Sequence, residues 1–292
     1  MLSQSKSKYA YPLWWFGIKF SLAATLCIFI INIVINRNSL PFPTGICLYV
    51  DFSFLLYVPV KCLMVILLII FVVLYILEKK MLLSLFMLSI FSILFFSIEE
   101  SNGNTAENGI LSLIFLSQFV TYFFINKPGE FNYKYYRVQF PAQVIAANYT
   151  LSALSKLNES GVSWFLSDSP KLSLEIMRFY YGEYISTGNA LFAEQGNKIA
   201  QFMLDTPIVL SVLLGVTLLL ELCSFVLIIN SRLARRYAAA LLFMHLGIYI
   251  VLKIFFPVFI LPLIIIFFNP LYYFLNYCKV MPNAFCHIIQ DK

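Results

Sequence analysis

Long apolar runs alternate with short polar segments along the whole chain. The runs predict eight membrane-spanning helices, at residues 14–35, 59–77, 81–98, 110–125, 138–157, 207–230, 237–252 and 254–275. Several of them reach the roughly 18 apolar residues that a helix needs to cross a bilayer. The pattern therefore predicts an all-α fold, a polytopic integral membrane helical bundle in which residues 1–292 form a single transmembrane domain.

Two stretches between the predicted spans are also rich in apolar residues. Residues 52–58 are too few to cross a bilayer, so we expect a re-entrant or interfacial segment there. Residues 158–206 form a long loop, within which residues 171–185 combine helical spacing with several aromatic side chains. That combination is typical of a helix lying at the membrane interface. The first run lacks a small-residue cleavage site, so we interpret it as a retained helix rather than a signal peptide.

Basic and acidic residues alternate from one inter-span segment to the next. Most lysines and arginines lie in the N-terminal segment, in the segments after the second, fourth and sixth spans, and in the C-terminal segment. Most acids lie in the remaining loops. Because basic residues favour the cytoplasmic side of a membrane, this bias predicts cytoplasmic termini and an extracytoplasmic loop at residues 158–206.

The composition supports a membrane protein and excludes other classes. Hydrophobic residues make up 61% of the chain and charged residues 12%, about half the charged share of a soluble domain. The net charge of +6 follows the predicted topology, so it does not indicate binding to nucleic acid. The six cysteines include no CxxC pair, and four lie in or beside apolar spans, which favours buried free thiols over a disulfide or a metal site.

The most polar of the predicted spans ends in a lysine. Asn148, Ser152, Ser155 and Lys156 are spaced to share one face of this fifth span, and Trp164 follows in the loop. An ionisable group at membrane depth is costly and usually faces the interior of a bundle, which makes Lys156 a functional candidate. The alternative is that Lys156 only extends its ammonium group to the outer interface.

Two further ionisable side chains lie inside predicted spans. Glu221 is in the sixth span and His245 in the seventh, with Tyr249 one turn and Lys253 two turns after the histidine. Glu221 could instead be a protonated residue that joins helices by hydrogen bonds, and His245 could be a structural hydrogen-bonding residue. With His287 the only other histidine, a metal site built on histidines is not expected. The chain also lacks nucleophile-elbow, Walker-type and dinucleotide glycine motifs.

A lysine beside a low-dielectric environment can act as a general base, because burial disfavours its charged form. Such a base could take a proton from an acidic hydroxyl on a lipid-soluble substrate. We therefore predict catalytic roles for Lys156, Glu221 and His245. We predict substrate-binding roles for Asn148, Ser152, Trp164 and Tyr249.

Three short motifs within residues 140–270 resemble the HTTM domain, the membrane domain shared with vitamin K-dependent gamma-carboxylases. They are SALSKL at residues 152–157 followed by Trp164, LLLEL at residues 218–222, and FMHLGI at residues 243–248 after the basic turn of residues 232–236. Their order and spacing are similar to those of the family. The first 140 residues are similar to it in hydropathy alone.

The resemblance implies a bundle whose site opens to the extracytoplasmic face. In the carboxylase branch the lysine that matches Lys156 is the base that deprotonates reduced vitamin K, which implies a quinone as the candidate cofactor. This sequence has no large soluble region after the eighth span and no histidine from the third to the fifth span, whereas the carboxylases have both. We therefore do not expect gamma-carboxylation. In size the chain is more similar to compact bacterial members that help mature a secreted antimicrobial or sporulation-delaying peptide.

We expect a compact HTTM-type protein of the bacterial inner (plasma) membrane. An outward-facing polar pocket would act on, or bind, a secreted peptide or a lipid-soluble quinone-like molecule; whether it is an enzyme stays open. The expected partners are the lipid bilayer and a secreted peptide or another membrane or extracytoplasmic protein, and not nucleic acid. The alternatives are a non-enzymatic scaffold or lipid- or peptide-binding partner, in which the polar residues serve helix packing, and a transporter, which the lack of an obvious inverted repeat disfavours.

Overall fold

A computed structural model of the protein describes residues 10–36, 48–101, 109–125, 131–161, 163, 169–253 and 256–278. Within these ranges every regular element is helical, and eleven α-helices are accompanied by two 3₁₀ segments and one π-helical segment. The all-α prediction is thus confirmed for this part of the chain. The helices group into two compact units, one of residues 1–145 with 261–292 and one of residues 146–260. The prediction of a single transmembrane domain stays a prediction.

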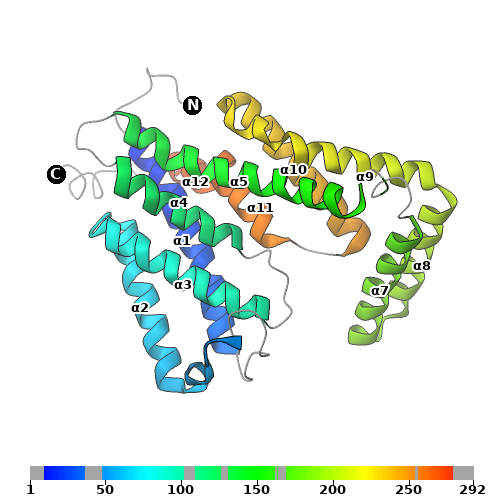
Figure 1. Ribbon diagram of the computed structural model, residues 1–292, viewed down its shortest axis with the longest axis horizontal. Coiled ribbons are helices and arrows are strands. Elements are labelled where there is room, and N and C mark those ends of the chain that lie inside the picture. The colour runs from blue at the N-terminus through cyan, green and yellow to red at the C-terminus, as the bar shows by residue number, and fades with distance from the viewer. Residues whose placement is uncertain are drawn as a thin grey trace. The chain divides into compact units, whose positions relative to one another are not determined.

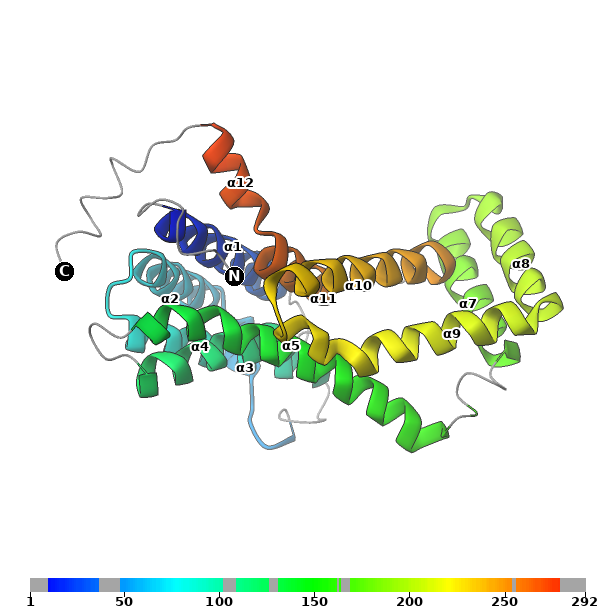
Figure 2. The same cartoon turned by 90° about the horizontal axis from the view of Figure 1, so that it is seen from above.

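The first unit contains four consecutive apolar helices. They are α1 (Ala10–Asn36), α2 (Val58–Ile76), α3 (Met81–Ser101) and α4 (Gly109–Ile125). The first half of α5 (Phe131–Ser160), the π-helical segment Ile264–Phe268 and α12 (Pro270–Tyr277) complete it. Helices α3 and α4 lie side by side in both views (Figures 1 and 2). The short 3₁₀ helix Ser53–Leu56 precedes α2, within the apolar segment that was expected to be re-entrant or interfacial.

A carboxylate at the turn between α2 and α3 joins three elements of the first unit. Glu78 Oε1 accepts hydrogen bonds from Lys19 Nζ and Trp15 Nε1 of α1, both at 2.9 Å, and from Arg137 Nη1 of α5 at 3.3 Å. Glu78 itself adopts a left-handed backbone conformation, with φ of 55°. Glycine is the usual residue at such a helix end because a side chain is strained there. The ionic contacts of Glu78 offset that strain.

The second unit is organised around a helical hairpin and two longer helices. The hairpin consists of α7 (Ser169–Thr187) and α8 (Ala190–Asp205), and the longer helices are α9 (Pro207–Leu222) and α10 (Ser231–Leu252). The end of α5 and the first residues of α11 (Pro257–Leu263) also belong to this unit. Helix α7 confirms the helix predicted at residues 171–185, whereas α8 was not predicted. The interfacial position of α7 stays a prediction.

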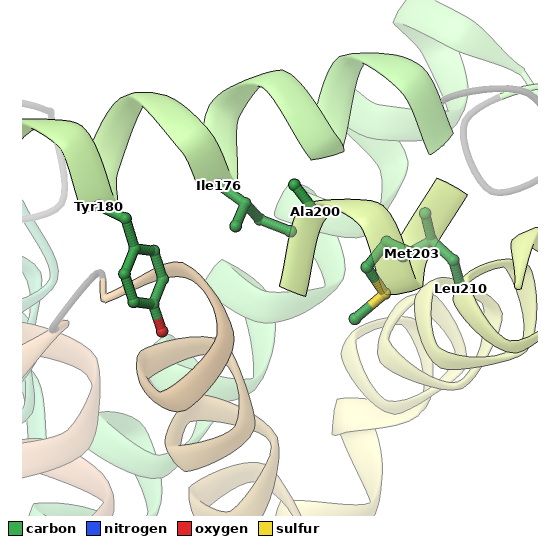
Figure 3. Close-up of a cluster of buried hydrophobic side chains, with 5 residues drawn as sticks. All are labelled: Ile176, Tyr180, Ala200, Met203 and Leu210. Atoms are coloured by element: carbon green, nitrogen blue, oxygen red, sulfur yellow. The ribbon is translucent and has the colours of Figure 1, made fainter. Parts of the chain in front are cut away.

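The hairpin has an apolar core of its own. Figure 3 shows Ile176 of α7 directed toward Ala200 of α8, and Met203 of α8 beside Leu210 of α9. Tyr180 of α7 belongs to the same cluster but points toward α10, where its hydroxyl donates a 3.1 Å hydrogen bond to the backbone oxygen of Ile250. All five side chains are buried. The two helices lie side by side in Figures 1 and 2, and the core holds them together and joins them to α9.

Four helical segments are long and apolar enough to cross a membrane: Leu13–Ile35, Val58–Ile76, Met81–Ile98 and Pro207–Ile228. A fifth would be the pair Pro257–Phe268 and Pro270–Tyr277, which is bent by 47°, if it forms one span. Only 17% of the α2 span and 22% of the Pro207–Ile228 span are buried by the protein, against 56% of the α3 span. These four to five candidate spans indicate an integral membrane protein. The remaining predicted spans coincide with α4, which has 17 residues, and with α5 and α10, which carry more polar residues.

The cysteines in the described residues are free thiols. Cys27 and Cys223 are partly buried, whereas Cys62 and Cys278 are exposed. The expectation of buried thiols is therefore wrong for Cys62 and Cys278. Cys62 lies on α2, of which the protein buries only 17%.

Candidate functional site

One face of α5 carries a line of polar residues within the second unit. Tyr149, Ser152 and Lys156 are spaced by three and four residues, so their side chains lie on the same side of the helix. Seven residues of α-helix span about 10 Å along the axis. The face therefore presents a tyrosine, a serine and a lysine in a line roughly two turns long.

Lys156 forms an ion pair with Glu221 of α9. The lysine Nζ lies 2.6 Å from Glu221 Oε1 and 2.5 Å from Oε2. The Glu221 side chain is 8% exposed and the Lys156 side chain 27% exposed. The Ser152 hydroxyl also hydrogen-bonds to the Glu221 carboxylate. The structure thus brings together two of the predicted catalytic residues and one of the predicted binding residues.

Hydroxyl groups fix the position of Glu221 relative to α5. After Leu222 the helix tightens into the 3₁₀ segment Cys223–Ile228. Ser224 Oγ in this segment donates a 2.6 Å hydrogen bond to the backbone oxygen of Ala146 and lies 2.9 Å from Thr150 Oγ1. These contacts lie one turn from the ion pair, so they hold the two helices in the register that places Glu221 opposite Lys156.

His245 of α10 pairs with Tyr149 instead of with Lys156 or Glu221. Its Nε2 lies 2.6 Å from the Tyr149 hydroxyl oxygen, and both residues are buried. The imidazole ring packs against two aromatic rings, with centroids 5.8 Å from Phe256 and 5.7 Å from Phe259. His245 Nδ1 is buried and has no hydrogen-bond partner in the part of the chain that the structure describes.

The ion pair and the Tyr149–His245 pair share the same face of α5. Glu221 lies near enough to Tyr149, and Lys156 near enough to His245, for an electrostatic interaction between their polar groups. Tyr149 was not predicted as a site residue, because a tyrosine in an apolar span is usually a packing residue. The only signal in the sequence was its spacing of three and seven residues from Ser152 and Lys156.

The other predicted binding residues are Tyr249, Asn148 and Trp164. Tyr249 is 41% exposed, and its ring lies 5.6 Å from Lys253 Nζ, which is also 5.6 Å from the Tyr180 ring. Asn148 is partly buried, and no hydrogen bond from it is seen in the described residues. Trp164 lies outside the described residues. The binding roles of all three therefore stay predictions.

The arrangement can hold charge and move protons. The close contact between an ammonium and a carboxylate allows a proton to pass between them, and Lys156 is the more exposed partner. Among the described residues no group of three or more His, Cys, Asp or Glu could hold a metal ion.

Comparisons with family models, with curated proteins and with solved structures found no match for this chain. The resemblance to the HTTM domain consequently rests on the short sequence motifs that include Lys156, Glu221 and His245.

Proposed function

We propose that this chain is a compact HTTM-type integral membrane protein whose Lys156–Glu221 pair binds, or acts on, a secreted peptide or a lipid-soluble quinone-like molecule. The proposal is carried by one observation, the ion pair between Lys156 on α5 and a carboxylate that is 8% exposed on an apolar span. Removing two charges from water costs several kcal/mol per ion, of order 10 kcal/mol for both. Ionisable residues at membrane depth are usually retained for function.

The two partners would have different roles. Lys156 is the more exposed partner and would contact the ligand, whereas the more deeply buried Glu221 would orient the Lys156 ammonium group. In an acid–base step the ammonium proton would move to Glu221 across the short contact, which leaves a neutral amine. That amine would take the proton of an acidic ligand hydroxyl, so that an ammonium, a protonated Glu221 and a ligand anion result. The Tyr149–His245 pair would lie deeper along the same helix face.

The proposed topology has eight spans with both termini in the cytoplasm of a bacterial cell. It is supported by the four to five candidate spans and by the alternating charge of the loops. A helix of 17 residues is about 26 Å long, close to the roughly 30 Å hydrocarbon core. In this topology Lys156 is at the extracytoplasmic end of its span, and the loop at residues 158–206 is outside the cytoplasm.

Cysteine labelling tests this topology. In a variant whose native cysteines are replaced by serine, Ser186→Cys at the exposed tip of the hairpin should react with a membrane-impermeant maleimide in intact cells. A variant that keeps Cys278 alone should react only after the membrane is opened. Labelling of Ser186→Cys solely from the cytoplasmic side would contradict the eight-span proposal.

Mass spectrometry of what co-purifies with the protein tests the function. Organic extracts and bound peptides are compared between wild type, Lys156→Ala and Lys198→Ala. Lys198 is the matched control, because its 2.5 Å ion pair with Glu194 lies on the exposed surface of α8. A quinone-like molecule or a peptide held by wild type and Lys198→Ala, and lost from Lys156→Ala, is the expected result. Ordinary phospholipid alone in all three would contradict the proposal.

The second candidate function is a non-enzymatic scaffold, and the Ser224 contacts favour it. Ser224 joins Ala146 and Thr150 of α5 independently of any ligand, as expected if this region only packs helices. A scaffold predicts that Lys156→Ala has no effect on function, whereas Glu221→Ala lowers the yield of folded protein. An enzyme predicts that Lys156→Ala accumulates in the membrane but is inactive.

A further inference from the structure

Within the described residues, the Tyr149–His245 pair has more polar hydrogen atoms to donate than acceptors within reach. A neutral imidazole carries one N–H, and a tyrosine carries one O–H. One hydrogen bond joins the two side chains in the described residues, between Tyr149 Oη and His245 Nε2 at 2.6 Å. In the described residues no other partner is seen for the Tyr149 hydroxyl, and His245 Nδ1 has none.

Both tautomers of His245 therefore lead to the same result. If Tyr149 donates to Nε2, the imidazole hydrogen is on Nδ1 and has no acceptor. If Nε2 donates to Tyr149, the hydroxyl hydrogen has no acceptor. One donor is left over in either case, and it is buried, because Tyr149 is 2% and His245 5% exposed. Buried donors in native proteins nearly always find a partner, so the missing acceptor is informative.

We propose that the Tyr149–His245 pair is a hydrogen-bond donor for a carbonyl oxygen of the molecule that the second unit binds. This inference rests on the proposed function, because it assigns a ligand to the same site. The aromatic rings of Phe256 and Phe259 beside His245 favour a neutral carbonyl on an apolar body over a carboxylate, which would lose its hydration without a counter-charge. Tyr149 either donates to His245 Nε2, which leaves the imidazole hydrogen on Nδ1 for the carbonyl oxygen, or accepts from Nε2 and offers its own hydroxyl hydrogen.

The chain is suited to a direct test by nuclear magnetic resonance, because it has only two histidines. In full-length protein labelled with ¹⁵N at histidine, His287→Asn leaves His245 as the single imidazole. The probe is α-tetralone, an aromatic ketone, and its control is tetralin, which has the same ring system without the carbonyl oxygen. We expect α-tetralone to shift the His245 nitrogen resonances and tetralin to leave them in place.

Matched variants connect the shift to Tyr149. Tyr149→Phe should weaken α-tetralone binding roughly tenfold, the usual effect of losing one hydrogen bond, whereas Tyr184→Phe makes the same change on the hairpin, away from His245, and should have no effect. The comparison of the two probes uses the native Tyr149 and His245, so it decides the question even if Tyr149→Phe does not fold. A second probe, N-acetyl-phenylalanine N-methylamide, separates the two sources of a carbonyl: binding at His245 indicates a peptide, and binding of the ketone alone indicates a lipid-soluble carbonyl compound.

Equal binding of tetralin and α-tetralone, or no shift of His245 with either carbonyl probe, would overturn the inference. These outcomes leave the proposed function standing if Lys156→Ala still loses the molecule that co-purifies with the wild type. The reverse outcome, in which α-tetralone shifts His245 but nothing specific co-purifies through Lys156, would contradict the proposed function and retain the donor role of the Tyr149–His245 pair.

Discussion

Gly196 of α8 lies so close to Tyr180 of α7 that a Cβ atom at residue 196 would be 2.5 Å from Tyr180 Cβ. Gly196→Ala should therefore separate the hairpin helices and cost about 1–3 kcal/mol of stability, as overpacking usually does. The thermal unfolding midpoint of the purified protein is the measurement. Gly182→Ala is the matched control, since nothing lies within 4 Å of its added Cβ, and it should be neutral or stabilising. An equal loss in both variants would contradict the tight packing at Gly196.

Removing one partner of the Lys156–Glu221 pair should destabilise the protein more than removing both partners together. Breaking a buried pair by removing one partner usually costs 3–5 kcal/mol. Because Lys156 is 27% exposed, we expect about 2–3 kcal/mol for Glu221→Leu or Lys156→Met alone. The double variant should recover much of that loss, because no unpaired charge is left buried.

A double-mutant cycle of thermal or denaturant unfolding measures this coupling. Arg178→Ala serves as the control, since Arg178 forms an exposed pair with Glu175 that should contribute close to nothing. Additive losses in the double variant would show that the two side chains do not interact in the membrane.

The Glu78 contacts should make the first unit sensitive to acid. Burial alone would raise the pKa of the Glu78 carboxyl, but the charges of Lys19 and Arg137, together with hydrogen bonds from Lys19 and Trp15, outweigh it and lower the pKa below its ordinary value of 4.5. A lowered pKa in the folded state contributes stability that is present above pH 4.5 and is lost as the pH falls through the folded-state pKa. The contribution of Glu78 should therefore be complete at neutral pH.

Glu78→Gln tests the acid sensitivity. The difference in unfolding midpoint between wild type and this variant should be largest near neutral pH and should shrink below pH 4.5. Glu194→Gln is a suitable comparison, because Lys198 also lowers the pKa of that carboxyl, but the pair is fully exposed and should contribute little at any pH. A difference that does not change with pH would mean that the Glu78 charge does not stabilise the fold.

Asn269 should contribute more to stability than an ordinary helix cap. It begins α12 by accepting a hydrogen bond from Tyr272 N, and its Nδ2 donates to the backbone oxygen of Trp14 at 2.6 Å. Its backbone is left-handed, with φ of 46°. Asn269→Ala should cost about 2–3 kcal/mol of stability. Asn230→Ala removes the N-cap of α10, where the backbone of residue 230 is extended rather than left-handed, and should cost about 1 kcal/mol. Unfolding midpoints compare the two, and a larger loss in Asn230→Ala would contradict this account.

The hydrophobic pattern predicted the helices well, because burial in lipid requires continuous apolar runs. Four predicted spans coincide with helices long and apolar enough to cross a membrane. The hairpin was predicted only in part, because α8 is an amphipathic helix with many polar residues, and its low overall hydrophobicity was interpreted as that of a loop. The tight turn at residues 78–80 was predicted, but the contacts of Glu78 with Lys19 and Arg137 were not, because these partners are distant in the sequence.

For the site, the sequence predicted the residues but not all of their partners. Lys156 and Glu221 were both expected to be functional, and the structure pairs them. His245 was expected beside them, but its partner is Tyr149, because the α5 face places the tyrosine two turns before the lysine. Contacts between helices depend on how the faces are rotated, and a hydropathy pattern in spans that are apolar on all sides carries little information about that rotation.

The two candidate spans that are least covered by protein differ in length. The α2 span has 19 residues, about 28 Å of α-helix, whereas Pro207–Ile228 has 22 residues, of which the last six are 3₁₀, and is about 36 Å long. A hydrocarbon core of about 30 Å cannot match both without local thinning at the shorter helix or tilting of the longer one. Because Glu221 lies on the longer helix, the acyl-chain length of the surrounding lipids acts directly on the helix that supplies the carboxylate of the ion pair.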